Sequence, residues 1–190
     1  MMLTPRSHVR NLGTAFDTLA SHSHHVSVLA YMISRMEGLS HAEALEAMAM
    51  GVFHDLAEAR VGDLDFIHKH YNKADEIRAV KDQFAGIDFA KDLHGLIDQF
   101  ESVKTKASKC ARDADSLAQL YMEWVLMWQG NKLAEKWYKS DFKDRVPNFK
   151  TKSAQKLALA MKNSNPHEWW WSQFIKNDQA IDLEKLLGKK

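Results

Sequence analysis

The chain has 190 residues, 45% hydrophobic and 27% charged, with 26 basic residues against 25 acidic ones. This is the length of one ordinary domain, so we expect a single domain over residues 1–190. A net charge of +1 gives no reason to expect a nucleic-acid partner, and no apolar stretch approaches the about 20 residues that cross a bilayer, so no membrane span is expected.

The chain contains a single cysteine, Cys110, which has no partner for an internal disulfide. The N-terminus lacks the apolar core and cleavage site of a secretory signal. We therefore expect a cytoplasmic protein.

Helix-forming residues dominate, with only three prolines and eight glycines, so the composition predicts an all-α fold. Thr4 before Pro5 predicts the start of a short first helix, and Gly13 predicts its end. Over residues 21–37 the apolar positions recur at helical spacing before Gly38, which predicts a second helix.

The pattern Ser40-x-x-Glu43 is a capping box, and it predicts a third helix that runs to about residue 59 with Leu45, Met48 and Val52 on its inward stripe. Residues 63–71 show no clear period and are predicted to form a loop. Further helices are predicted over residues 73–85, 88–100, 105–128, 150–163 and 178–187. The motif-bearing core then spans about residues 10–130, and C-terminal helices within 131–190 pack on it. We interpret the aromatic cluster Trp169–Trp171 as packing of a C-terminal helix or as a dimer contact.

Polar residues at the end of the third helix are the first indication of chemistry. His54 and Asp55 follow an apolar helix, and Glu58 lies one turn after His54 on the same face. Burial of such groups is costly unless they are paired or bind a cation. The segment therefore indicates either a metal site or a His–Asp ion pair.

Two more polar residues are predicted to point inward. His22 continues the apolar line of the second helix, whereas His24 and His25 are rotated away from it and are predicted not to be ligands. Asp115 shares a helical face with alanines, whereas Asp113 falls at the polar edge. Each alone would fit a hydrogen-bonded core residue. Together, two imidazoles and two carboxylates suit Mn, Fe, Co, Ni or Zn.

The pattern H…HD…D, formed by His22, His54-Asp55 and Asp115, resembles the signature of the HD-domain metal-dependent phosphohydrolases. Residues 54–63 also fit H-D-x-x-E-x-x-x-G-D. Ala20-Ser21-His22-Ser23 and Arg112-Asp113-Ala114-Asp115 resemble elements of the branch that contains bacterial 5′-deoxynucleotidases and their eukaryotic relatives. The resemblance covers about residues 10–123.

The resemblance implies a helical bundle around one divalent transition-metal ion per protomer, a homodimer, and hydrolysis of deoxyribonucleoside 5′-monophosphates to nucleoside and phosphate. Two departures bear on the substrate: Ser21 stands where the branch has an acidic residue, and the segment before it is about two residues longer. Within that segment, Arg10-Asn11-Leu12 resembles the R-N-V of the branch, so Arg10 is expected to meet phosphate.

In the expected mechanism Glu58 is the general acid or base, and Asp63 orients the attacking water or contacts the sugar. Arg10 and Arg60 offer guanidinium groups for phosphate. Two alternatives remain: the same site acting on a cyclic nucleotide, a nucleoside triphosphate or an alarmone, and a non-catalytic metal-binding dimerisation module.

Overall fold

The computed structural model describes residues 1–2, 4–13 and 17–168, with residues 10 and 11 described in their backbone alone. Within these ranges the chain forms helices, one isolated β-bridge and no strand, which confirms the all-α prediction. The elements are α1 (Val9–Leu12), α2 (Leu19–Met36), α3 (His41–Phe53), α4 (Glu58–Val61), α5 (Phe66–Tyr71), α6 (Glu76–Gln83), α7 (Ala90–Ser102), α8 (Lys106–Trp128), α9 (Lys132–Arg145), the 3₁₀ turn η1 (Val146–Asn148) and α10 (Lys152–Lys162). None of these helices is long and apolar enough to cross a membrane.

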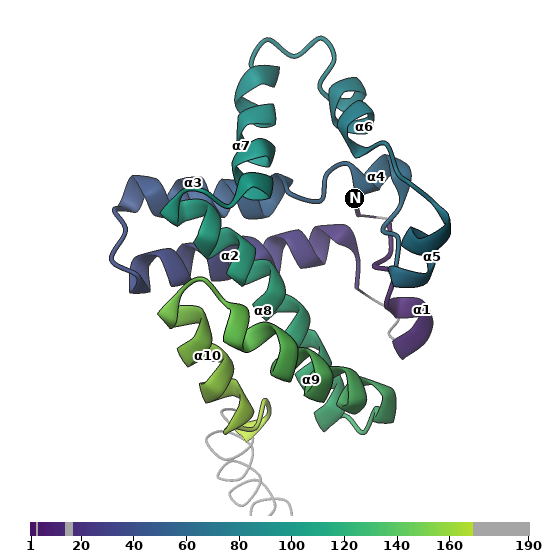
Figure 1. Ribbon diagram of the computed structural model, residues 1–190, viewed down its shortest axis with the longest axis vertical. Helices are drawn as coiled ribbons and strands as arrows, with labels where there is room; N and C mark the ends of the chain where they lie inside the picture. Colours follow the sequence, from purple (N-terminus) through teal and green to yellow (C-terminus); the bar gives the residue numbers. More distant parts are fainter. Residues whose placement is uncertain (3, 14–16, 169–190) are drawn as a thin grey trace, which may run out of the picture.

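The centre of the fold is the antiparallel pair α2 and α3, which α8 crosses (Figure 1). Fully buried side chains from these helices and from α7 form the main core, among them Val26, Ile33, Met50, Phe100 and Leu120. The short helices α1, α4, α5 and α6 gather at one end of the pair, and α9 and α10 lie on the opposite side of α8 from α7 (Figure 1).

Each of the three central helices begins directly after a capping residue, and the Ser40 cap is the one that the sequence predicted. Thr18, Ser40 and Thr105 each accept a hydrogen bond from a backbone N–H in the first turn, and each belongs to a reciprocal capping box. The predicted second helix and the helix over 105–128 are confirmed to within two residues at each end.

Helix α3 packs on α2 through small residues. A Cβ built on Gly51 would lie 2.9 Å from the backbone N and Cα of Ser27, so only glycine allows this approach. The inward face of α3 consists of Ala44, Ala47, Met50 and Gly51. The predicted inward stripe was wrong, because Leu45 and Val52 are exposed. Close helix contact required small residues where a large apolar stripe was expected.

Four further predictions of secondary structure need correction. The segment around Pro5 is extended and pairs with Thr18, so α1 begins at Val9 and not at the predicted start. Helix α3 ends at Phe53, and a turn precedes α4. The predicted loop contains α5, which Asp65 caps.

Helix α9 was not predicted. The predicted helix over 178–187 and the tryptophan cluster lie outside the described residues.

Asp113 was predicted to lie at the polar edge of its helix, but it is buried. Its carboxylate accepts hydrogen bonds from the backbone N–H groups of Lys150 and Thr151, at 3.0 and 2.7 Å, and from the Thr151 hydroxyl at 2.7 Å. These groups precede α10. Long-range capping therefore fixes α10 to α8, and helical periodicity alone could not reveal that.

Candidate metal centre

Four polar side chains converge at the end of the α2–α3 pair. His22 lies in the first turns of α2, His54 and Asp55 directly follow α3, and Asp115 lies within α8. Because α2 and α3 run antiparallel, the start of one and the end of the other meet at the same end of the bundle, beside the N-terminal segment (Figure 1).

The ligand-type atoms of these residues lie close together. His22 Nε2 is 3.1 Å from Asp115 Oδ1, and His54 Nε2 is 3.2 Å from Asp55 Oδ2. His22 Nε2 also lies 3.6 Å from Asp55 Oδ2, and His54 Nε2 also lies 3.8 Å from Asp115 Oδ1. His22, His54 and Asp115 each offer one ligand atom within 4.8 Å of the other two.

The orientation of His54 leaves one ring nitrogen for a ligand. Its Nδ1 lies 2.9 Å from the carbonyl oxygen of Gly51, and a carbonyl only accepts, so Nδ1 carries the hydrogen and donates it. In the neutral ring the lone pair then belongs to Nε2. This atom is buried and makes no aligned hydrogen bond within the described structure. Such a buried nitrogen fits a first-row divalent metal, as does the mixed nitrogen and oxygen donor set.

The charges around the cluster favour a cation at its centre. Burial opposes a charge on the His54 imidazole, but Asp55 and Asp115 outweigh it and raise the pKa of His54 to about 10. Burial also opposes ionisation of Asp115, yet the hydrogen bond from His22 and the His54 charge hold its pKa well below the usual range. A proton and a metal ion therefore compete for the same nitrogen.

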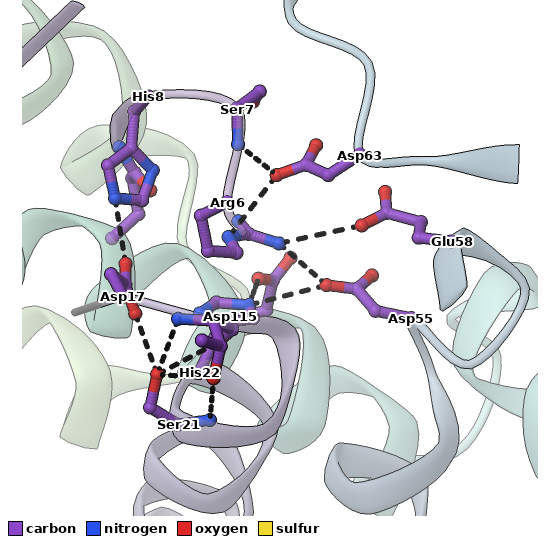
Figure 2. A network of polar contacts seen from close by, with 12 residues as sticks. Arg6, Ser7, His8, Asp17, Ser21, His22, Asp55, Glu58, Asp63 and Asp115 are labelled. Carbon is purple, nitrogen blue, oxygen red and sulfur yellow. Dashed lines mark hydrogen bonds and ion pairs between the residues drawn. The ribbon is translucent and has the colours of Figure 1, made fainter. Parts of the chain in front are cut away.

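Arg6 is the residue that sequence reasoning missed. Figure 2 shows it between three carboxylates: its Nη1 lies 2.8 Å from Asp55 Oδ2 and 3.8 Å from Glu58 Oε2, and its Nε lies 3.5 Å from Asp63 Oδ2. Because Pro5 was interpreted as the start of a helix, the extended segment that carries Arg6 was not predicted. The only available signal was an arginine beside a proline, which does not specify a site.

Several contacts hold the extended segment in place. The Ser7 backbone N–H donates to Asp63 Oδ2 at 2.8 Å, and the Arg6 backbone N–H donates to the Asp17 carbonyl at 3.1 Å. His8 Nε2 pairs with Asp17 Oδ2 at 2.7 Å (Figure 2). Asp63 therefore contacts the Arg6 guanidinium and the Ser7 backbone N–H.

Glu58 lies at the edge of the cluster with an oxygen that accepts no hydrogen bond from any described residue. Its Oε2 is buried and has no hydrogen-bond partner within the described structure. Burial and the nearby charges of Asp55 and Asp63 raise its pKa to about 8, against the lowering effect of Arg6. A carboxyl group in this environment can hold or release a proton near neutral pH.

Apart from His22, these groups line one cavity of about 300 Å³. Its lining includes three cationic and six acidic side chains, together with His54, Ala57 and Phe100; the charged residues are Arg6, Lys69, Arg112, Asp55, Glu58, Asp63, Glu76, Glu101 and Asp115.

Three other residues of interest lie apart from this cavity. His24 is exposed, and His25 packs its ring edge-on against Tyr121 with centroids 4.8 Å apart, so neither joins the cluster. Arg60 is exposed and does not line the cavity, which contradicts its expected contact with phosphate there. The side chain of Arg10 lies outside the described structure.

Comparison with solved structures shows a shared fold. The structural-genomics target APC5600 is 26% identical, with a TM-score of 0.67, covering 88% of this chain and 91% of that chain. A conserved hypothetical protein from Pyrococcus furiosus is 17% identical, with a TM-score of 0.67, covering 86% and 94%. The PH0347 protein from Pyrococcus horikoshii OT3 is 18% identical, with a TM-score of 0.64, covering 85% and 91%. No curated protein matches the chain.

The family model described as HD domain matches residues 3–163, which is most of the chain. The match begins before the N-terminal segment that carries Arg6 and continues through α10, so it includes helices beyond the predicted motif-bearing core. The chain therefore belongs to the HD-domain family, whose general activity is metal-dependent phosphoester hydrolysis.

Proposed function

We propose that this protein is a 5′-deoxynucleotidase, which hydrolyses deoxyribonucleoside 5′-monophosphates to nucleoside and inorganic phosphate. The observation that carries the proposal is the cluster of two histidines and two aspartates beside a cavity that Arg6 and Glu58 line. The resemblance of residues 54–63 to H-D-x-x-E-x-x-x-G-D supports the choice of nucleotidase.

His22, His54, Asp55 and Asp115 would hold one divalent transition-metal ion. Bound there, such an ion supplies Lewis-acid polarisation of a phosphate oxygen and lowers the pKa of water. The mixed nitrogen and oxygen donor set suits Mn, Fe, Co, Ni or Zn.

The remaining residues act on the phosphate and the protons. Arg6 donates to a phosphate oxygen, since its guanidinium is already held at the carboxylates of the site. Asp63 positions Arg6 through both the guanidinium and the Ser7 N–H. Water loses a proton as it attacks phosphorus, the bond from phosphorus to the 5′ oxygen breaks, and the 5′ oxygen gains a proton and leaves as the alcohol. Glu58 is the group placed to move that proton.

Phosphate release from a substrate panel tests the proposal. The panel contains deoxyribonucleoside and ribonucleoside 5′-monophosphates, cyclic nucleotides, nucleoside triphosphates, an alarmone and sugar phosphates, each assayed with Mn, Co, Ni and Mg. We expect metal-dependent release from deoxyribonucleoside 5′-monophosphates above all others, and none in the Asp115→Asn variant. Preference for a cyclic nucleotide, a triphosphate or an alarmone would contradict the proposal, and no turnover with any metal would favour the non-catalytic module.

We also propose that the protein is a homodimer, as the family resemblance implies. The outward face of α2 supports this, because Val28, Met32 and Met36 recur there one turn apart and are exposed. Light scattering on the purified protein measures the mass. Met32→Lys should shift the population toward monomer, and a monomeric parent would contradict the proposal.

A further inference from the structure

A second arginine, besides Arg6, lines the cavity. Arg112 lies on α8, one turn before the candidate ligand Asp115. Arg6 contacts Asp55 at 2.8 Å, whereas Arg112 Nη1 lies 4.0 Å from Asp115 Oδ2. The Oδ1 atom of the same aspartate faces His22. The two arginines thus stand beside different carboxylates of the cluster, and both line the same cavity.

Arg112 is held in place by groups other than the cluster. Its guanidinium carbon lies 4.0 Å from the centroid of the Phe100 ring, and that ring in turn packs on His54 with centroids 4.7 Å apart. Its Nη2 pairs with Glu101 Oε2 at 3.1 Å and donates to the Phe100 carbonyl at 3.4 Å. These contacts fix the plane of the guanidinium and reduce the entropy that a ligand must remove.

One nitrogen of this fixed guanidinium makes no hydrogen bond within the described structure, and its ion-pair partner Asp115 lies 4.0 Å away. Nη2 makes the contacts with Glu101 and Phe100, while Nη1 makes no hydrogen bond to any described residue. Because the side chain is about one-third exposed and lines the cavity, Nη1 can donate to a ligand that enters beside Asp115.

The charge of the cavity makes each cation important for an anionic ligand. Six carboxylates line it against three cations, of which Lys69 is an exposed side chain at the rim. A phosphomonoester dianion carries twice the charge of a phosphodiester monoanion, so the attraction to a fixed guanidinium is twice as large at the same distance. A second arginine therefore favours the dianion selectively.

We propose that Arg112 is a second phosphate-binding residue, besides Arg6, that selects dianionic phosphomonoesters over monoanionic phosphodiesters. This inference rests on the proposed function and specifies the substrate class of the same site. It also assigns a role to the Phe100 ring, which positions Arg112 by stacking beneath it.

Calorimetry on the metal-loaded full-length protein tests the proposal without turnover. The probes are inorganic phosphate at pH 8, which is mainly a dianion, and dimethyl phosphate, which is a monoanion. In Arg112→Met we expect the affinity for phosphate to fall about 10- to 100-fold, as for loss of one hydrogen bond between charged groups. The affinity for dimethyl phosphate should fall much less. The matched control is Arg78→Met on α6, which removes an exposed arginine outside the cavity and should change neither affinity.

An equal loss for both probes, or no loss for phosphate, would overturn the proposal. If Arg112→Met does not fold, Arg112→Lys decides the matter, because it keeps the charge but not the planar fork. The quantity to compare is the affinity for phosphate divided by the affinity for dimethyl phosphate. A several-fold drop of this ratio in Arg112→Lys supports the proposal, and a ratio equal to that of the parent protein contradicts it. Failure of the nucleotidase proposal is distinguishable from failure of this one. The first would appear as the wrong substrate preference in the substrate panel, while the ratio of the two affinities could still fall in the Arg112 variants.

Discussion

At the scale of single residues, Glu58 combines burial with an unsatisfied oxygen beside the candidate ligands. It follows the turn that carries His54 and Asp55, and it begins α4. Its backbone N–H donates to the Asp55 carbonyl at 3.1 Å, which ties its position to the ligand pair. The side chain is thus held near the reacting groups without a necessary role as a ligand.

Glu58→Gln should abolish most hydrolysis while the metal stays bound. The change removes proton transfer, preserves side-chain size and leaves the four proposed ligands intact, so the rate should fall by about 10² to 10⁴. Phosphate release measures the rate, and elemental analysis of the purified variant measures the metal. Activity within a few-fold of the parent would remove Glu58 from the mechanism, and loss of the metal would make it a ligand.

Glu123 is a second buried carboxyl, on α8 and apart from the metal centre. It is fully buried, and Gln119 donates to its Oε1 at 2.7 Å, but its Oε2 has no partner within the described structure. Burial and the charge of Asp141 raise the pKa of Glu123 to about 7. The folded protein therefore holds a proton on Glu123 that the unfolded chain releases at lower pH.

Stability should consequently fall as the pH rises from about 4.5 to 7. Below about pH 4.5 both states are protonated and the contribution of Glu123 is fully present; above it, the unfolded chain ionises first and the contribution is lost. The loss is on the order of 3 kcal/mol, from about 1.4 kcal/mol per pKa unit.

Glu123→Gln should remove this part of the pH dependence and stabilise the protein at pH 8. Urea unfolding of parent and variant across the pH range measures the difference. Glu135→Gln on α9 is the control, because the hydrogen bond from Lys139 lowers the pKa of this exposed carboxyl, so no comparable loss toward high pH is expected. Parallel curves for parent and Glu123→Gln would contradict the assignment.

At the scale of helices, Gly51 links packing to the candidate metal centre. The glycine allows α3 to approach the backbone of Ser27, and its carbonyl accepts the hydrogen bond that orients His54. A side chain at this position would push α3 away from α2 and shift the imidazole.

Gly51→Ala should therefore weaken both folding and metal binding. A Cβ at 2.9 Å from backbone atoms forces the helices apart, and overpacking of this kind costs about 1–3 kcal/mol. Chemical denaturation and metal titration measure the two effects. Gly95→Ala, at a helical glycine of α7 with no atom within 4 Å, is the matched control and should stabilise the protein by about 0.5–1 kcal/mol. If Gly51→Ala leaves the metal affinity unchanged, the packing of α3 on α2 does not control the metal site.

The fold could be predicted from the sequence where the signal is local. Caps such as Ser40 and Thr105 define helix starts, because the hydrogen bonds they make lie within one turn. Helix α9 was missed because its sequence is largely polar and lacks a clear apolar period, although Asn131 caps it within one turn. Asp113 was misjudged for a different reason: its partners are 37 and 38 residues away.

The candidate site likewise contains residues that local spacing predicts and one residue that only contacts distant in sequence hold in place. His22, His54 and Asp115 follow from helical spacing together with the family resemblance. Arg6 could not be predicted, since contacts with Asp55 and Asp63, 49 residues or more away, hold it in place. Local periodicity carries no information about an extended segment that is positioned by such contacts.

At the scale of the whole molecule, the candidate ligands connect three helices. A metal bound by residues of α2, α8 and the turn after α3 would join them at one end of the bundle. It would bind the folded protein and not the unfolded chain, so it should stabilise the fold.

Removal of the metal should therefore lower the melting temperature. At a free-metal concentration about 100 times the Kd, binding to the folded state alone stabilises it by about 2.7 kcal/mol. Thermal unfolding with a chelator and then with added Mn or Co measures the effect, and Asp115→Asn should show no response to the metal. A melting temperature unaffected by chelation of a metal-loaded sample would mean that the ion does not join the helices.

The spread of the candidate ligands along the chain also sets an order of events during protein synthesis. The imidazole of His22 leaves the ribosome early, the His54-Asp55 pair follows, and Asp115 emerges only when much of α8 has been made. A nascent chain that ends before α8 can present at most three of the four groups, and they lack the helix that brings them together. Metal loading is then a late step. The ion that binds is set by the metal concentrations around the nearly completed domain, and not by those around the earlier, ribosome-bound segment.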